Sequence, residues 1–174
     1  GIDSIKSMDI PEKELLWKKV GFDPEKKTVM VLQHPVTNES SEAARQMVLT
    51  LAAASRFDAQ KLVIYPNQDA GSHDIIDVFN KFRNDPQFTF VSNLNHNEYL
   101  GMLRHADVLV GNSSGGIIET PALGLPVVNV GPRQEGRERA DNVIDAPYDS
   151  DAIERGIAMA ISLDFKHKAR QCSN

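Results

Sequence analysis

The sequence segment that decides the fold is Val108-Leu109-Val110-Gly111-Asn112-Ser113-Ser114-Gly115-Gly116-Ile117-Ile118-Glu119. Its first four residues are typical of a buried strand, and they run directly into small hydroxyl and glycine residues and then a helical pattern. Strand–turn–helix units of this kind build parallel α/β sheets, whose ligands bind at the carboxyl ends of the strands. The turn would offer several backbone N–H groups and two hydroxyls at the positive end of a helix, which is a suitable cradle for an anion.

The same alternation of short apolar runs and helical patterns extends on both sides of this segment. The predicted strands span residues 28–33, 61–65, 88–91, 108–111 and 126–130. The predicted helices span 39–55, 75–82, 99–103 and about 149–161, with a short helix between Pro11 and Gly21. Their candidate N-caps are Asn38 or Ser40, Ser72 and Asp149. The predicted fold class is therefore α/β, with a doubly wound, Rossmann-like parallel sheet.

Composition excludes several classes of protein. The chain has 174 residues, of which 41% are hydrophobic and 25% charged, as in one globular domain. Its single cysteine, Cys172, cannot form an internal disulfide, and no apolar run approaches the roughly 20 residues of a membrane helix. No signal-peptide pattern is present, so we expect a cytoplasmic protein without a membrane partner. A net charge of −5 and an aromatic content of 6% argue against nucleic-acid binding, and the dispersed histidines predict no metal site.

Polar residues follow the other predicted strands, at the ligand edge of the sheet. His34 follows the first strand, where its ring could bind a phosphate or a leaving oxygen, or instead serve as a capping or packing residue. Arg133 follows the last strand, and its planar fork of donors suits a phosphate, although the neighbouring glutamates are also typical of a solvated surface. Glu119 stands one helical turn after Gly115, where its carboxylate could accept hydrogen bonds from ribose or remain solvated. Together these residues suit a nucleotide diphosphate.

A second interpretation of the same segment is a serine hydrolase. Residues 111–115 match the G-x-S-x-G motif of the nucleophile elbow, with Ser113 as the nucleophile. The acid and the base of such an enzyme should follow in the sequence, yet the only downstream histidine is His167, near the C-terminus. The hydrolase is therefore the alternative from another class.

Four sequence blocks resemble the UDP-N-acetylglucosamine 2-epimerases in order and spacing. The blocks are HPVT at 34–37, YPNQDAG at 65–71, GNSSGGIIE at 111–119 and GPRQEGR at 131–137, followed by NVI at 142–144. The resemblance implies the two-domain GT-B fold, of which this chain would be the C-terminal, nucleotide-binding half. Residues 1–10 would then be the interdomain crossover segment and residues 11–174 the UDP-binding domain, with the N-terminal catalytic half absent from this chain.

The resemblance also implies a substrate, UDP-N-acetylglucosamine, and a reaction without a cofactor or metal. In that reaction UDP leaves by anti-elimination, and water or UDP then adds to the 2-acetamidoglucal from the other face. By the same resemblance His34 is catalytic and approaches the diphosphate, and Leu94 contacts uracil through its backbone. The resemblance further implies that Asn67 faces the sugar and that Ser113 and Ser114 bind the phosphates. It also implies that Glu119 binds the ribose and that Arg133 binds the anionic end of the substrate. The implied substrate-binding set is His34, Asn67, Asp69, Leu94, Ser113, Ser114, Gly115, Glu119 and Arg133.

The block at 131–137 resembles the hydrolysing branch of the family, which releases UDP and N-acetylmannosamine for sialic-acid-type pathways. Gly115 departs from many members of this branch, which carry a third serine there, so one hydroxyl is lost while the N–H remains. The alternatives are a non-hydrolysing epimerase giving UDP-N-acetylmannosamine, a GT-B UDP-sugar glycosyltransferase, or a domain that only binds. The family's acid and base carboxylates lie in the N-terminal half. The resemblance therefore implies that the N-terminal half is a partner of this chain and that this chain alone does not turn over substrate. We also expect a homo-oligomer.

Overall fold

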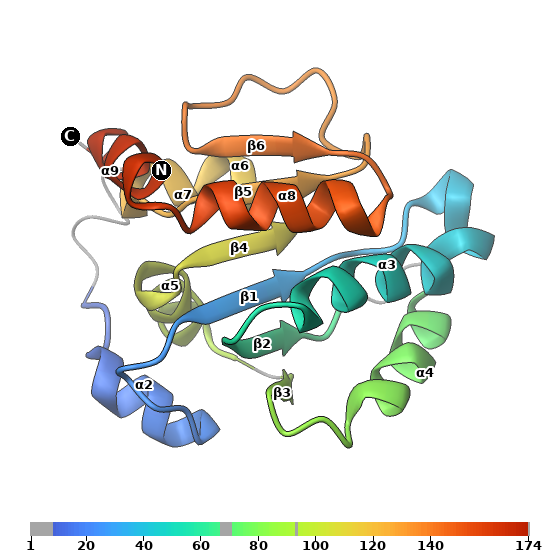
Figure 1. Ribbon diagram of the computed structural model, residues 1–174, viewed down its shortest axis with the longest axis horizontal. Helices are drawn as coiled ribbons and strands as arrows, with labels where there is room; N and C mark the ends of the chain where they lie inside the picture. The colour runs from blue at the N-terminus through green and yellow to red at the C-terminus, as the bar shows by residue number, and fades with distance from the viewer. Residues whose placement is uncertain (1–8, 67–70, 93, 174) are drawn as a thin grey trace.

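The computed structural model describes residues 9–66, 71–92 and 94–173. Within them, six parallel strands form one sheet in the order β3-β2-β1-β4-β5-β6 (Figure 1). The strands are β1 (Thr28–Leu32), β2 (Gln60–Ile64), β3 (Phe88–Val91), β4 (Val108–Gly111), β5 (Val127–Val130) and β6 (Val143–Ala146). The strand order reverses direction between β1 and β4, which is the topological switch point of a doubly wound sheet. The predicted fold class is confirmed.

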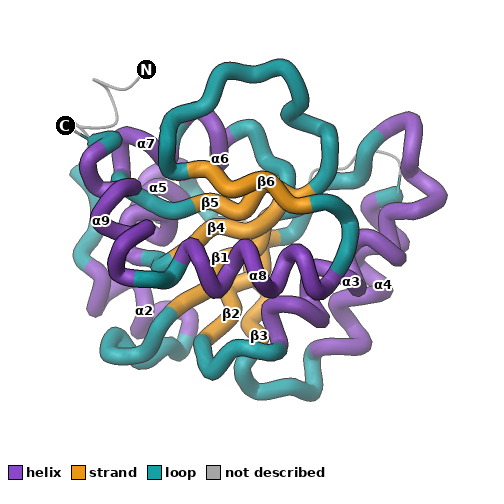
Figure 2. Tube along the Cα trace, turned by 45° about the horizontal axis from the view of Figure 1, so that its top comes forward, coloured by secondary structure: helices purple, strands orange, loops and turns teal. Residues whose placement is uncertain are grey.

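The sequence pattern misses the edge strand β6. Val143 and Ile144 are only partly buried and Asp145 is exposed, so the strand lacks the continuous apolar run of its neighbours. No helix separates it from β5, and a long loop arches over it instead (Figure 2). A βα unit is identified by a continuous apolar strand and an adjacent helical pattern, and both are absent at this edge.

Helices cover both faces of the sheet. The contacts place α3 and α8 together and α4 beside α3, whereas α5 contacts α2 and α7 (Figures 1 and 2). The helices of the group around α3 are α3 itself (Ala43–Ser55), α4 (Ser72–Phe82) and α8 (Ser150–Ala160). The remaining elements are α2 (Lys13–Val20), η1 (Thr37–Glu42), α5 (His96–His105), α6 (Gly115–Ile118), α7 (Thr120–Leu123) and α9 (Leu163–Gln171).

The core is divided into two layers by the sheet. Along β1, Val29 and Val31 belong to the cluster under α3 and α8, whereas Met30 and Leu32 belong to the cluster under α2 and α5. This alternation follows from the two-residue period of a strand, and it makes a strand apolar at every position when both faces are covered. The apolar runs that predict the inner strands have this origin.

Several predicted helix starts are wrong. The helix expected over 39–55 begins only at Ala43, because the 3₁₀ helix η1 occupies the preceding turn, and its N-cap is Glu42 without a side-chain bond. Gly71, with a φ of 93°, is the N-cap of α4 in place of Ser72. Asp149 does cap α8, accepting from the N–H of Ala152 at 2.8 Å. The last helical region divides into α8 and α9.

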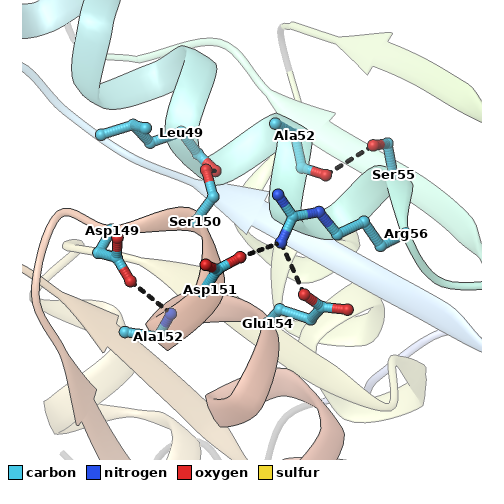
Figure 3. A network of polar contacts seen from close by, with 9 residues as sticks. All are labelled: Leu49, Ala52, Ser55, Arg56, Asp149, Ser150, Asp151, Ala152 and Glu154. Carbon is cyan, nitrogen blue, oxygen red and sulfur yellow. Dashed lines mark hydrogen bonds and ion pairs between the residues drawn. The ribbon is translucent and has the colours of Figure 1, made fainter.

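A polar network joins α8 to the end of α3 (Figure 3). The Nη1 of Arg56 donates to Asp151 at 2.8 Å and to Glu154 at 2.6 Å, and the hydroxyl of Ser150 donates to the carbonyl of Leu49 at 3.0 Å. The two carboxylates raise the pKa of the Arg56 guanidinium. Because exposed ion pairs add little stability, we expect these contacts to contribute only a small part of the free energy of folding.

Candidate functional site

Asn112 joins the ends of the two strands that flank the switch point. It directly follows β4, and its side chain is buried, with the residue 1% exposed. Its Oδ1 accepts from the backbone N–H of His34 at 2.7 Å, and its Nδ2 donates to the carbonyl of His34 at 2.8 Å. Two opposed bonds to one residue fix the course of the chain after β1. His34 is therefore held at the carboxyl edge of the sheet, where sequence reasoning expected it.

The close approach of β4 to β1 at this point requires a glycine. Gly111 has a φ of +144°, and a Cβ added to it would lie 1.9 Å from the carbonyl oxygen of Leu32. No side chain fits in that space. The glycine therefore allows Asn112 to reach the backbone of His34.

The loop after β5 is tied to the same residue. The Nη1 of Arg133 donates to the carbonyl of Asn112 at 3.0 Å, and the Nε2 of Gln134 donates to the same oxygen at 2.9 Å. Arg139 donates to the carbonyl of Gln134 at 3.1 Å and also pairs with Asp145 in β6. A guanidinium has five N–H groups, and the bond to Asn112 uses one of them. Arg133 is thus positioned at the switch point with further donor capacity for an anion.

The serine turn, which comprises residues 112–114, is followed by a very short helix. α6 has four residues, and after Glu119 the chain continues into α7, also of four residues. The amides of Gly116 and Ile117 bond to the carbonyls of Ser113 and Ser114, each at 3.0 Å. The macrodipole of so short a helix is small, so an anion here would depend on the amides and hydroxyls of residues 113–115 and on Arg133.

Glu119 lies beside the turn, as its spacing predicts. A Cβ added to Gly115 would be 2.9 Å from the Oε1 of Glu119, so the carboxylate faces Gly115. Burial raises the pKa of Glu119, and the positive charge of His96 opposes this shift. A partly desolvated carboxylate is a strong acceptor for hydroxyl donors.

A cavity of about 490 Å³ opens at the carboxyl edge of β1, β2 and β3. It brings together His34 and Leu94, two of the predicted site residues. Its full lining is Leu32, His34, Ile64, Tyr65, Pro66, Ser72, Ile76, Ser92, Leu94 and Tyr99. The predicted residues Ser113, Ser114, Glu119 and Arg133 do not line this cavity, and Tyr99 is the lining residue that contacts Ser113. Asn67 and Asp69 lie outside the described residues.

Sequence reasoning missed the roles of Asn112 and Tyr99. Asn112 is one of the free positions of the G-x-S-x-G pattern, and Tyr99 belongs to an apolar stripe that also contains the buried Leu100 and Leu103. No feature of the stripe separates a tyrosine at the site edge from one in the core.

Another cavity of about 490 Å³ lies between the loop after β5 and β6, and it contains none of the predicted site residues. Within the described parts of the chain, no three His, Cys, Asp or Glu residues are grouped so that they could hold a metal ion. The same residues contain no helix long and apolar enough to cross a membrane.

The sequence profile of one protein family, described as UDP-N-acetylglucosamine 2-epimerase, matches residues 1–174. The chain belongs to this family. Among curated relatives, the UDP-N,N'-diacetylbacillosamine 2-epimerase (hydrolyzing) of Legionella pneumophila is 36% identical over 93% of this chain and 43% of its own length. The polysialic acid biosynthesis protein P7 of Escherichia coli is 32% identical over 100% of this chain and 45% of its own length. The chain thus spans less than half the length of these relatives.

A solved structure of the same family supports the fold. The UDP-GlcNAc 2-epimerase of Neisseria meningitidis, described as bound to UDP-GlcNAc, matches 97% of this chain and 45% of its own chain. The TM-score is 0.72 at 14% sequence identity. The chain therefore has the fold of one half of a GT-B enzyme.

The family assignment does not favour the serine hydrolase. The hydroxyl of Ser113 accepts from the N–H of Gly115 at 3.3 Å and lies near the phenol of Tyr99. His167, which the hydrolase order would need as its base, lies in α9, where its Nε2 is 3.2 Å from the amide of Gln171. The sequence order and these contacts give Ser113 no catalytic triad.

Proposed function

We propose that this chain is the UDP-binding half of a hydrolysing UDP-N-acetylglucosamine 2-epimerase. The supporting observation is the junction at Asn112, whose polar atoms bond to the backbone of His34 and to the guanidinium of Arg133. It gathers three loops at the switch point of the sheet, which is where doubly wound proteins bind nucleotides. In this proposal residues 11–174 form the UDP-binding domain, and a missing N-terminal half supplies the acid and base carboxylates.

The chemistry assigned to this half is stabilisation of a leaving group. When the bond between the sugar C1 and UDP breaks, negative charge develops on the diphosphate. Arg133 and the hydroxyls of Ser113 and Ser114 would stabilise that charge, and the His34 ring would donate to the leaving oxygen. Donors that are already positioned need no reorganisation as charge develops, which lowers the barrier. Leu94 and Glu119 would hold the uridine, and Asn67 and Asp69 would face the sugar.

The hydrolysing outcome is supported by the name of one relative. The Legionella relative is named as hydrolyzing, and the RQEGR run at 133–137 carries Arg133 and Gln134, which both bond to Asn112. The same relative supports a second substrate candidate, UDP-N,N'-diacetylbacillosamine. Both candidates contain UDP, so this half of the enzyme would bind the same group in either substrate.

Isothermal calorimetry of the chain with UDP tests the binding site. We expect Arg133→Ala to weaken UDP binding by about tenfold or more, because a charge-assisted bond to phosphate is lost. Glu119→Ala should weaken it less, by about three- to tenfold, because a neutral hydroxyl donor loses its acceptor. Arg137→Ala is the matched control, since it removes the same charge from an exposed position of the same loop. Absence of UDP binding by the parent chain, or unchanged affinity in both site variants, would overturn the proposal.

The reaction itself is tested on the protein that includes the N-terminal half. Incubation with UDP-N-acetylglucosamine, followed by proton NMR, should give free N-acetylmannosamine and UDP in equal amounts. UDP-N-acetylmannosamine as the product would instead assign the non-hydrolysing reaction, and turnover only with an added acceptor sugar would assign a glycosyltransferase. A parallel incubation with UDP-N,N'-diacetylbacillosamine compares kcat/KM and identifies the preferred sugar.

A further inference from the structure

Three polar side chains converge on Gly115. A Cβ built at this residue would lie 2.6 Å from the hydroxyl of Tyr99, 2.9 Å from the Oε1 of Glu119 and 3.6 Å from the Oγ of Ser113. Tyr99 comes from α5, Ser113 precedes α6 and Glu119 follows α6. The first two distances are shorter than van der Waals contacts, so a side chain at residue 115 would displace the phenol and the carboxylate, whereas the glycine leaves room for both.

The phenol of Tyr99 projects from a capped helix and stays protonated. α5 begins with a reciprocal cap, in which Asn95 accepts from the N–H of Glu98 at 2.8 Å and Glu98 accepts from the N–H of Asn95 at 3.2 Å. Its next residue, Leu100, is fully buried. Burial, with a further contribution from the negative charge of Glu119, raises the pKa of Tyr99 to about 12. The side chain is therefore a neutral hydrogen-bonding group at every physiological pH.

Tyr99 connects two parts of the candidate site. Its side chain lines the cavity that contains His34 and Leu94, and its hydroxyl lies beside Gly115 on the side of the Ser113 hydroxyl, which does not line that cavity. A serine hydroxyl rotates freely unless a partner fixes it. With Tyr99 on one side and the N–H of Gly115 at 3.3 Å on the other, the Ser113 hydroxyl has one preferred orientation.

We propose that Tyr99 is a positioning residue for the diphosphate: its phenol fixes the Ser113 hydroxyl, and Gly115 is a glycine because the phenol occupies the space of a side chain. This inference rests on the proposed UDP site and adds a residue to it. Fixing a donor before the ligand arrives lowers the entropy lost on binding, so the benefit falls on the phosphate contact and not on the nucleoside.

The test compares UDP with uridine, by calorimetry, on the parent chain, Tyr99→Phe, Ser113→Ala and the double variant. We expect Tyr99→Phe to weaken UDP binding by roughly tenfold and uridine binding by less than about threefold. Since Tyr99 acts through Ser113, adding Tyr99→Phe to Ser113→Ala should cost little more affinity for UDP. Tyr148→Phe is the matched control, because it removes a buried phenol hydroxyl beside β6 and should leave UDP binding unchanged.

The possible outcomes separate this inference from the proposed function. Failure of the parent chain to bind UDP overturns both. If the parent binds and Tyr99→Phe leaves UDP affinity unchanged, weakens UDP and uridine equally, or adds its full effect to Ser113→Ala, only the role of Tyr99 is overturned. Gly115→Ala gives an independent check: its loss of UDP affinity and that of Tyr99→Phe should combine to less than their product, because removing the phenol oxygen makes room for the methyl group.

Discussion

Ser114 and Ser162 both occupy the N-cap position of a helix, yet only one of them uses its hydroxyl there. At the start of α9, the Oγ of Ser162 accepts from the N–H of Phe165 at 3.3 Å. At the start of α6, Ser114 makes no side-chain cap bond. The backbone explains the difference, since Ser162 is extended with a ψ of 151°, whereas Ser114 is already helical with a ψ of −29°. An N-cap side chain reaches the first turn only from an extended backbone.

The difference teaches how to separate structural polar groups from candidate ligand-binding ones. At the α8–α9 junction, the hydroxyl of Ser162 is used for the capping bond. The β4–α6 junction is built by glycine and asparagine and leaves Ser114 without a capping role, at the edge of the sheet where a ligand would bind. A hydroxyl that a short helix start does not need for capping is therefore informative once it lies at the switch point.

The most damaging way to break the β4–α6 junction is Gly111→Ala. Its methyl group would lie 1.9 Å from the carbonyl oxygen of Leu32 and would also force a positive φ on alanine. We expect a loss of unfolding free energy of about 3 kcal/mol or more, measured by urea denaturation. Gly136→Ala is the control, because Gly136 has a φ of +87° with nothing within 4 Å of the added Cβ. It should cost only about 1 kcal/mol. Equal losses in the two variants would show that the close approach to β1 is not required.

The comparison of the two serines is sharpened by making the same change at both. Ser162→Ala should lower the unfolding free energy by about 1 kcal/mol, because a capping bond is lost, and should leave UDP binding unchanged. Ser114→Ala should do the reverse, with little change in stability and UDP binding weakened by about three- to tenfold. Denaturation and calorimetry on both variants measure this. A stability loss at Ser114 as large as that at Ser162 would contradict the distinction.

The smallest expected effect is the pH dependence of Glu119→Gln. Because burial raises the pKa of Glu119 in the folded chain, the folded state binds its proton more tightly than the unfolded state does. The stability that this contributes is fully present below the ordinary pKa of 4.5 and is lost as pH rises through the raised value. Glutamine does not titrate, so the variant should gain stability relative to the parent as pH rises from below 4.5 through the raised pKa of Glu119. A difference that does not change with pH would contradict it, and Asp77→Asn, at an exposed carboxylate in α4, is the control.

Much of the fold can be predicted from the sequence, because the inner strands are apolar on both faces and alternate with helical patterns. β3 and β4 are predicted to the residue, since Phe88–Val91 and Val108–Gly111 are bounded by polar or turn residues. β6 is missed because it is a half-exposed edge strand without a preceding helix. The caps are less predictable. Serine is a residue type that favours the N-cap position, yet the N-cap of α4 is Gly71, which has a positive φ and precedes Ser72.

In the candidate site, a residue can be placed from the sequence only where its position after a strand determines where it lies. His34 and Arg133 follow strand ends, and parallel strands bring such residues to one edge. The length of α6 is not predictable, because Gly115 and Gly116 fit the start of a long helix or a short one equally well. Tyr99 shares a helical period with core leucines, and its contact with Ser113 depends on the packing of α5 against the serine turn. Contacts between elements distant in the sequence leave no periodic signal.

The bonds that Asn112 makes to residue 34 use only the main-chain N–H and carbonyl of His34. Any residue except proline offers the same two groups. These two bonds therefore do not depend on which side chain stands at residue 34. A substitution of the imidazole keeps both of them. The main chain of residue 34 is thus supported separately from its side chain, so under the proposed function this position is a direct place to test which side chain the reaction needs.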